Sequence, residues 1–232
     1  MKLLKETKAS NLHGRWYADA CGTAFAMELV GERWSLLIVR ELMLGARRFS
    51  DLRASLPGIS AKVLTERLGT LAEAGVLIRK TLPPPAASRV YELTEWGYAA
   101  EPAIQELGRW AAQSAGHNPM LPLSPVSLML SLRTMFDPAK AAGMRARIGF
   151  VLAGEAFLAE MADGKLPIRR VDEPKGEAIF HAPEAPVLAG IFYAKLPMEE
   201  LEDEGALRIE GDRDLALRFA DIFELPAKLI RI

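Results

Sequence analysis

Hydrophobic positions recur at helical spacing in the first half of the chain, most clearly between residues 60 and 75. Leu64, Leu68, Leu71 and Ala72 return at one-turn intervals and predict the buried side of an amphipathic helix. Ser60 before them is a suitable N-cap, because its hydroxyl can accept a hydrogen bond from a first-turn amide. The outer side of this helix is expected to carry short and polar side chains, namely Ala61, Lys62, Thr65, Glu66 and Arg67.

The segments on either side of this helix predict the rest of a small domain. Apolar residues over 49–56 indicate a short preceding helix, which Pro57-Gly58 closes with a tight turn. Gly75 is placed to end the second helix, and two strands are expected over 76–82 and 89–93. The Pro-rich loop between these strands cannot pair in a sheet. Helix, turn, helix and hairpin in this order are typical of a winged helix-turn-helix, which places one helix in a DNA groove.

Further helices and a linker are predicted around this unit. After a polar N-terminal arm, a short helical pattern runs from Cys21 to Val30, and a longer amphipathic one begins at Trp34 and ends near Gly45. A longer pattern follows Thr94 to about residue 115, with Pro102 inside it as a kink or a restart. Three prolines within 117–125 mark a linker. We therefore predict a first domain over 1–116 and a second over 126–232.

The second half of the chain predicts an α+β domain. An apolar helix over 126–136 precedes short apolar runs with turn residues between them, which are typical of antiparallel strands. The expected strands are 148–152, 156–161, 166–171, 178–181 and 207–210. Helices are expected over 186–193 and 198–204, and Asp212 is expected to cap a last one.

Charge strengthens the DNA-binding interpretation of the first half. The net charge of the chain is −1, but residues 33–89 contain ten Lys and Arg against four acids. Such a local excess favours binding to a phosphate backbone. The residues expected to contact DNA are those on the capped helix and on the hairpin: Ser60, Lys62, Thr65, Arg67 and Arg89. For the helix taken alone, an ordinary solvated face is an equally good interpretation.

Other chemistry has little support in the sequence. The three histidines are far apart and form no metal-binding motif, and there is no phosphate-binding glycine loop or nucleophile elbow. We expect no enzymatic activity, no cofactor and no metal. A single cysteine, a charged N-terminus and the absence of a long apolar run favour a cytoplasmic protein that does not enter a membrane.

Motifs along the first half resemble those of HxlR-type winged-helix regulators, relatives of the MarR group. They are Cys21-Gly22, the segment 29–38, Arg47 to Leu52, Gly58-Ile59-Ser60, Leu64 to Leu68 and Tyr91 to Gly97. The resemblance implies a DNA-binding transcriptional regulator. It also makes Cys21 a redox-sensing candidate, because some members sense oxidants or electrophiles with a cysteine at this place, although Gly22 stands where a proline is common. The alternative is that Cys21 is a small buried hydrophobe. Since one winged domain reads a half-site, we expect a homodimer on a pseudo-palindromic operator.

The second half resembles the sterol-carrier-protein type 2 fold. The matching positions are Asp163 to Leu166, Ala182-Pro183, Leu188, Leu201, Ile209 to Asp212, Phe219 and Phe223. This resemblance implies a domain that holds an apolar or lipid-like effector, although its Met and Phe residues could equally fill a core. The sequence thus predicts a DNA-binding regulator with a ligand-binding second domain. The alternative is a lipid-binding or lipid-handling protein whose winged domain mediates protein contacts.

Overall fold

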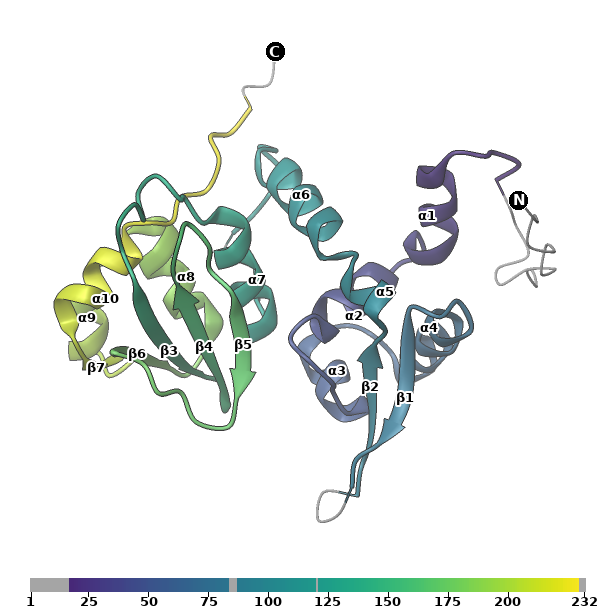
Figure 1. Ribbon diagram of the computed structural model, residues 1–232, viewed down its shortest axis with the longest axis horizontal. Coiled ribbons are helices and arrows are strands. Elements are labelled where there is room, and N and C mark those ends of the chain that lie inside the picture. Colours follow the sequence, from purple (N-terminus) through teal and green to yellow (C-terminus); the bar gives the residue numbers. More distant parts are fainter. Residues whose placement is uncertain (1–16, 84–86, 120, 230–232) are drawn as a thin grey trace. The chain divides into compact units, whose positions relative to one another are not determined.

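A computed structural model describes residues 17–83, 87–119 and 121–229 (Figure 1). The chain forms two compact units, residues 1–100 and 101–232. Most of the predicted N-terminal arm and the tip of the predicted hairpin loop lie outside the described residues. None of the helices in the described part is long and apolar enough to cross a membrane.

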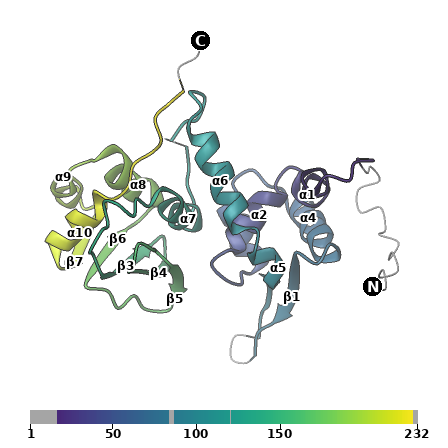
Figure 2. The ribbon, with the colours of Figure 1, turned by 45° about the horizontal axis from the view of Figure 1, so that its top comes forward.

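The first unit is a winged helix-turn-helix, as predicted. Its elements in chain order are α1 (Gly22–Val30), α2 (Ser35–Leu42), α3 (Phe49–Ser55), α4 (Ala61–Glu73), β1 (Leu77–Thr81), β2 (Arg89–Leu93) and α5 (Glu95–Tyr98). The antiparallel hairpin β1–β2 projects from the helices (Figures 1 and 2). Backbone hydrogen bonds in both directions between Arg47 and Tyr91, of 2.9 and 2.8 Å, attach β2 to the segment before α3.

Helix α4 forms where the hydrophobic pattern predicted it. The hydroxyl of Ser60 accepts a hydrogen bond from the amide of Val63 at 3.2 Å, and Gly75 has the positive φ of +75° that favours glycine after a helix. Leu64, Leu68 and Leu71 are buried, with at most 2% of their surface exposed. Ala72, which we expected in the same stripe, is exposed because the buried stripe ends one residue earlier.

The second unit is α+β. Its helices are α6 (Glu101–Ala112), α7 (Pro125–Met135), α8 (Ala185–Ala194), α9 (Met198–Asp203) and α10 (Arg213–Ala220). Its strands are β3 (Ala146–Leu152), β4 (Glu155–Met161), β5 (Ile168–Val171), β6 (Ala178–Ala182) and β7 (Arg208–Gly211). They form one sheet in the order β5-β4-β3-β6-β7, in which β3 and β6 are parallel and the other neighbours antiparallel.

The connection from β5 to β6 makes this sheet more than the expected meander. After β5 the chain crosses to the other side of β3, and two glycines allow it to pass closely. A Cβ atom on Gly149 would lie 2.9 Å from the Cβ of Pro174, and one on Gly176 would lie 2.6 Å from the amide nitrogen of Gly149. Side chains larger than hydrogen at these positions would displace the crossing segment.

Phenylalanine rings form the centre of the second unit. Phe150 on β3 and Phe180 on β6 are stacked with centroids 5.6 Å apart, and Phe192 on α8 meets Phe180 edge-on at 5.4 Å. Phe219 on α10 and Phe223 after it are 5.0 Å apart and contact the same group. All five rings are fully buried. They fill the space between the sheet and the helices α8 and α10.

Helix α6 belongs to the second compact unit, although the sequence placed it in the first domain. The predicted long helix after Thr94 is divided into α5 and α6, and Pro102 is the second residue of α6, as a restart there requires. Helix α6 packs on α7, and Arg133 of α7 pairs with Glu101 at 2.6 Å. At its other end, the ammonium of Lys228 donates to the carbonyl of Ala112 at 2.8 Å. These contacts, and not the Pro-rich segment, set the boundary between the units.

Candidate nucleic-acid interface

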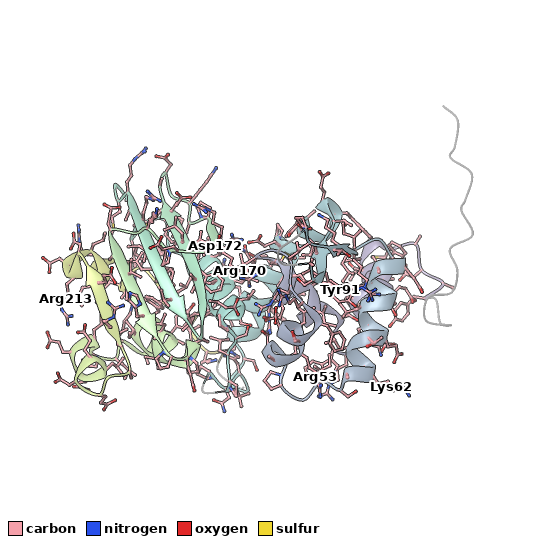
Figure 3. All side chains as sticks on the ribbon, turned by 90° about the horizontal axis from the view of Figure 1, so that it is seen from below. Arg53, Lys62, Tyr91, Arg170, Asp172 and Arg213 are labelled. Atoms are coloured by element: carbon pink, nitrogen blue, oxygen red, sulfur yellow. The ribbon has the colours of Figure 1, made fainter. Side chains whose placement is uncertain are left out.

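The outer side of α4 and the end of α3 present exposed cationic groups. Ala61, Lys62, Thr65 and Glu66 are all exposed, as the sequence predicted. Arg53 in the last turn of α3 is also exposed, and in the view of Figure 3 it lies on the same side of the first unit as Lys62. Neither Arg53 nor Lys62 has an ion-pair partner among the described residues. Both cations are therefore available to an external anion.

The two hydroxyl residues predicted at this site already make hydrogen bonds within the helix. Ser60 caps α4 through Val63, and the hydroxyl of Thr65 donates to the carbonyl of Ala61 at 2.9 Å. Each hydroxyl oxygen keeps a further lone pair or proton position for an external group. Their first role is to fix the start of α4, which is the end of the helix that approaches DNA in this class of fold.

Arg67 lies apart from the other predicted DNA contacts. Its guanidinium pairs with Glu32 at 3.1 Å and with Glu66 at 3.5 Å, and its side chain is only 15% exposed. Five residues of helix separate it from Lys62, a rotation of about 140° around the axis. Arg67 therefore connects α4 to the segment between α1 and α2 and does not extend the surface that carries Lys62.

The hairpin contributes a second cationic group. Arg89, at the start of β2 and opposite Thr81, is exposed and has no ion-pair partner in the part of the chain that the structure describes. Its neighbours are engaged: Lys80 pairs with Glu92, and the guanidinium of Arg79 lies 5.9 Å from the ring centroid of Tyr91. Arg89 is thus the free cation of the described wing.

Sequence reasoning missed Arg53. Helix α3 has only seven residues, too few for a clear hydrophobic period, so its polar side was not assigned. The tight turn, in which Gly58 has a φ of +90°, leaves only five residues between the end of α3 and the start of α4. The available signal in the sequence was the cation Arg53, four residues before the Pro57-Gly58 turn.

Cys21 is exposed and precedes the first residue of α1. The backbone and hydroxyl of Thr23, and then the backbone of Ala24, stabilise the thiolate and lower the pKa of Cys21 below its ordinary value. No residue of α1 is buried. In the single chain Cys21 is therefore not buried, unlike the small buried hydrophobe of the alternative interpretation.

No group of three His, Cys, Asp or Glu side chains among the described residues could hold a metal ion. His117 and His181 lie in different parts of the second unit, where they bond to Lys228 and to Glu210, and His13 falls outside the described residues. The site thus offers exposed cationic side chains, which are suited to an anionic partner.

Comparisons with known proteins give sequence matches over the first half of the chain. The family model for the HxlR-like helix-turn-helix matches residues 29–119. The HTH-type transcriptional regulator YvaP of Bacillus subtilis (strain 168) is 39% identical over 88 residues, which are 38% of this chain and 82% of YvaP. YodB of the same organism, also an HTH-type transcriptional regulator, is 40% identical over 88 residues, 38% of this chain and 79% of YodB. The solved structure of the reduced form of YodB is 36% identical and covers 42% of this chain and 97% of that one, with a TM-score of 0.38.

Proposed function

The chain belongs to the HxlR-like helix-turn-helix family of transcriptional regulators, and on that premise we propose that it binds double-stranded DNA through α4 and the β1–β2 hairpin. The observation that carries this proposal is the unpaired, exposed Lys62 at the start of a helix that Ser60 caps. Lys62, Arg53 and Arg89 would contact phosphates, and the short side chains Ala61 and Thr65 would let the helix approach base edges.

Fluorescence anisotropy tests this proposal, with a DNA duplex from the region upstream of the gene that encodes this protein. Binding by the wild type should weaken steeply with salt, and Lys62→Ala should lower the slope of log affinity against log salt by about 0.9, the value for one phosphate contact. Lys175→Ala, which removes an exposed cation of the second unit, is the matched control. Equal affinities and slopes for wild type and Lys62→Ala would exclude Lys62 from the interface.

We further propose that the protein acts as a homodimer on a pseudo-palindromic operator. Large apolar side chains that are exposed to solvent support this. Met27 on α1 is 42% exposed, and Leu107 and Trp110 on α6 are 45% and 70% exposed. Such exposure of large apolar groups is typical of a surface that another chain covers. Light scattering should give the mass of a dimer at micromolar concentration, and a monomer there would refute the proposal.

A redox response through Cys21 is a third proposal, which its exposure and lowered pKa support. A lowered pKa means that thiolate is present at a lower pH than in an ordinary thiol. The rate of alkylation by iodoacetamide should therefore rise with a midpoint at lower pH in the native protein than in the denatured chain. Within this sequence no second cysteine can resolve an oxidised Cys21, so a disulfide would join two chains or use a small thiol. A native midpoint equal to the denatured one would contradict the proposal.

For the second unit we retain the proposal of a sterol-carrier-like domain that modulates DNA binding. A single sheet with helices packed on it supports that fold assignment. The phenylalanine rings occupy the space between the sheet and the helices. This favours a structural role for the rings and disfavours the binding of a lipid-like effector between them. The alternative function, lipid handling, would require these rings to move apart. The shift of the melting temperature of the full chain on addition of fatty acids distinguishes lipid handling from a structural role of this space.

A further inference from the structure

A hollow of about 420 Å³ in the second unit is lined by charged residues from three separated segments of the chain. Lys140 follows α7, Lys195 follows α8 and Arg218 lies on α10, while Asp221, Ile222 and Glu224 follow α10. Three cations that are distant in sequence therefore meet at one place. The volume is within the range of about 300–1,000 Å³ for sites that hold small molecules.

Lys195 is fixed at the wall of this hollow. It ends α8 in the left-handed conformation, with φ +55°, and its ammonium donates to the carbonyls of Ala220 at 2.8 Å and Phe223 at 2.9 Å. An ammonium has three donors, so one N–H remains. The nearest carboxylate oxygen, of Asp221, is 4.0 Å away and outside hydrogen-bond distance. Burial lowers the pKa of Lys195; the charges of Asp221 and Glu224 act against this shift, and the charge of Lys140 adds to it.

Arg218 has more unused donors than Lys195. Its side chain is exposed, and its Nε donates to the carbonyl of Asp214 in the same helix at 3.4 Å. The other four N–H groups of this guanidinium have no acceptor among the described residues. Lys140 differs, because it forms an ion pair with Glu224.

The acids of the hollow compensate these cations only in part. The side chains of Asp221 and Glu224 are 82% and 65% exposed, whereas those of Lys140 and Lys195 are 38% and 40% exposed. Water screens the more exposed carboxylates more strongly than the partly buried ammonium groups. The donors that remain unused therefore point to an anionic ligand.

We propose that this hollow binds a small dianion, a phosphomonoester or a dicarboxylate, between Arg218, Lys195 and Lys140. The oxygens of the ligand would accept hydrogen bonds from the free N–H of Lys195 and from the free N–H groups of Arg218. The ligand would also compete with Glu224 for Lys140. Planar donor pairs of a guanidinium are suited to such oxygens. This site is separate from the phenylalanine-filled interior and does not depend on the DNA-binding proposal.

Isothermal titration calorimetry on the full chain without DNA tests the site. The probes are glycerol 3-phosphate, inorganic phosphate and succinate, each at the same ionic strength set with sodium chloride. Arg218→Ala should weaken binding about tenfold, the effect of losing one charge-assisted hydrogen bond. Glu224→Gln should tighten binding by about threefold, because it removes a competing carboxylate. Arg145→Ala removes an exposed arginine that pairs with Asp163 elsewhere in this unit and should change nothing.

Each result decides for or against the site. A preference for glycerol 3-phosphate or for succinate identifies the class of dianion. The proposal fails if none of the probes binds beyond the effect of chloride, or if Arg218→Ala and Arg145→Ala behave alike. It also fails if binding is lost in the Arg53→Ala, Lys62→Ala double variant and kept in Arg218→Ala, because the anion would then lie on the first unit. Circular dichroism of each variant confirms that it is folded.

Discussion

The two units of this protein treat their charged side chains differently. In the first unit, Arg53, Lys62 and Arg89 are exposed without an ion-pair partner among the described residues. In the second, most arginines pair with acids within the unit: Arg133 with Glu101, Arg147 and Arg169 with Glu160, Arg170 with Glu155, Arg208 with Glu210 and Arg213 with Glu202. Free cations favour a polyanionic partner, whereas paired cations serve the fold. Arg218, with its unused donors, is the exception among the described arginines of this unit, and it lines the proposed anion site.

The largest expected effect concerns the aromatic core of the second unit. Phe180→Ala removes a fully buried ring that touches Phe150, Phe192 and Phe219. It should lower the free energy of unfolding by about 3–5 kcal/mol, from lost burial and a residual cavity. Chemical denaturation measures this, with Leu217→Ala, an exposed apolar position on α10, as the control. Equal losses for the two variants would mean that the rings do not form the core described here.

Arg133 tests whether paired cations of the second unit are structural. Its side chain is 18% exposed, pairs with Glu101 and donates to the carbonyl of Ile168. Arg133→Ala should destabilise the protein by about 1–3 kcal/mol, because it removes the ion-pair partner of Glu101 and the side-chain donor to the carbonyl of Ile168. Among the described residues, the carboxylate of Glu101 then keeps only its hydrogen bond from Gln105. Arg109→Ala is the matched control, since Arg109 pairs only with the exposed Glu106 at 3.5 Å. If both variants keep wild-type stability, pairing in this unit contributes little to folding.

Arg53 tests the opposite behaviour in the first unit. Arg53→Ala should weaken DNA binding by about tenfold, as expected for one lost charge-assisted phosphate contact. Its stability should stay within about 0.5 kcal/mol of wild type, because the side chain is exposed and unpaired. Anisotropy and thermal denaturation of the same samples provide both values. A loss of stability with unchanged DNA affinity would mean that Arg53 stabilises the fold and does not contact DNA.

The smallest expected effect is that of Arg67, which the sequence placed among the DNA contacts. Because it pairs with Glu32, Arg67→Ala should lower stability by less than about 1 kcal/mol and DNA affinity by less than Lys62→Ala does. Glu32→Gln is the informative companion, since it releases Arg67 without removing its charge. If Arg67→Ala weakens DNA binding as much as Lys62→Ala, the ion pair with Glu32 does not hold in the complex.

Local patterns in the sequence determined much of the first unit. Helix α4, its buried side and the hairpin that follows were predicted from spacing alone. The signals were the Ser60 cap, the buried Leu64, Leu68 and Leu71 and the turn glycines, all of which act over a few residues. The strands and helices of the second unit were predicted for the same reason, with boundaries that differ by a few residues.

Only the tertiary structure decided how distant residues meet. The parallel pairing of β3 with β6, the packing of α6 on α7 and the placement of Arg53 and Lys62 on one side of the first unit depend on chain crossings and turns that carry no period in the sequence. The same holds for Arg67, whose partner is 35 residues away, and for the cations at 140, 195 and 218. A hydrophobic pattern specifies which side of an element is buried, but the partner of each charged group is set by long-range packing.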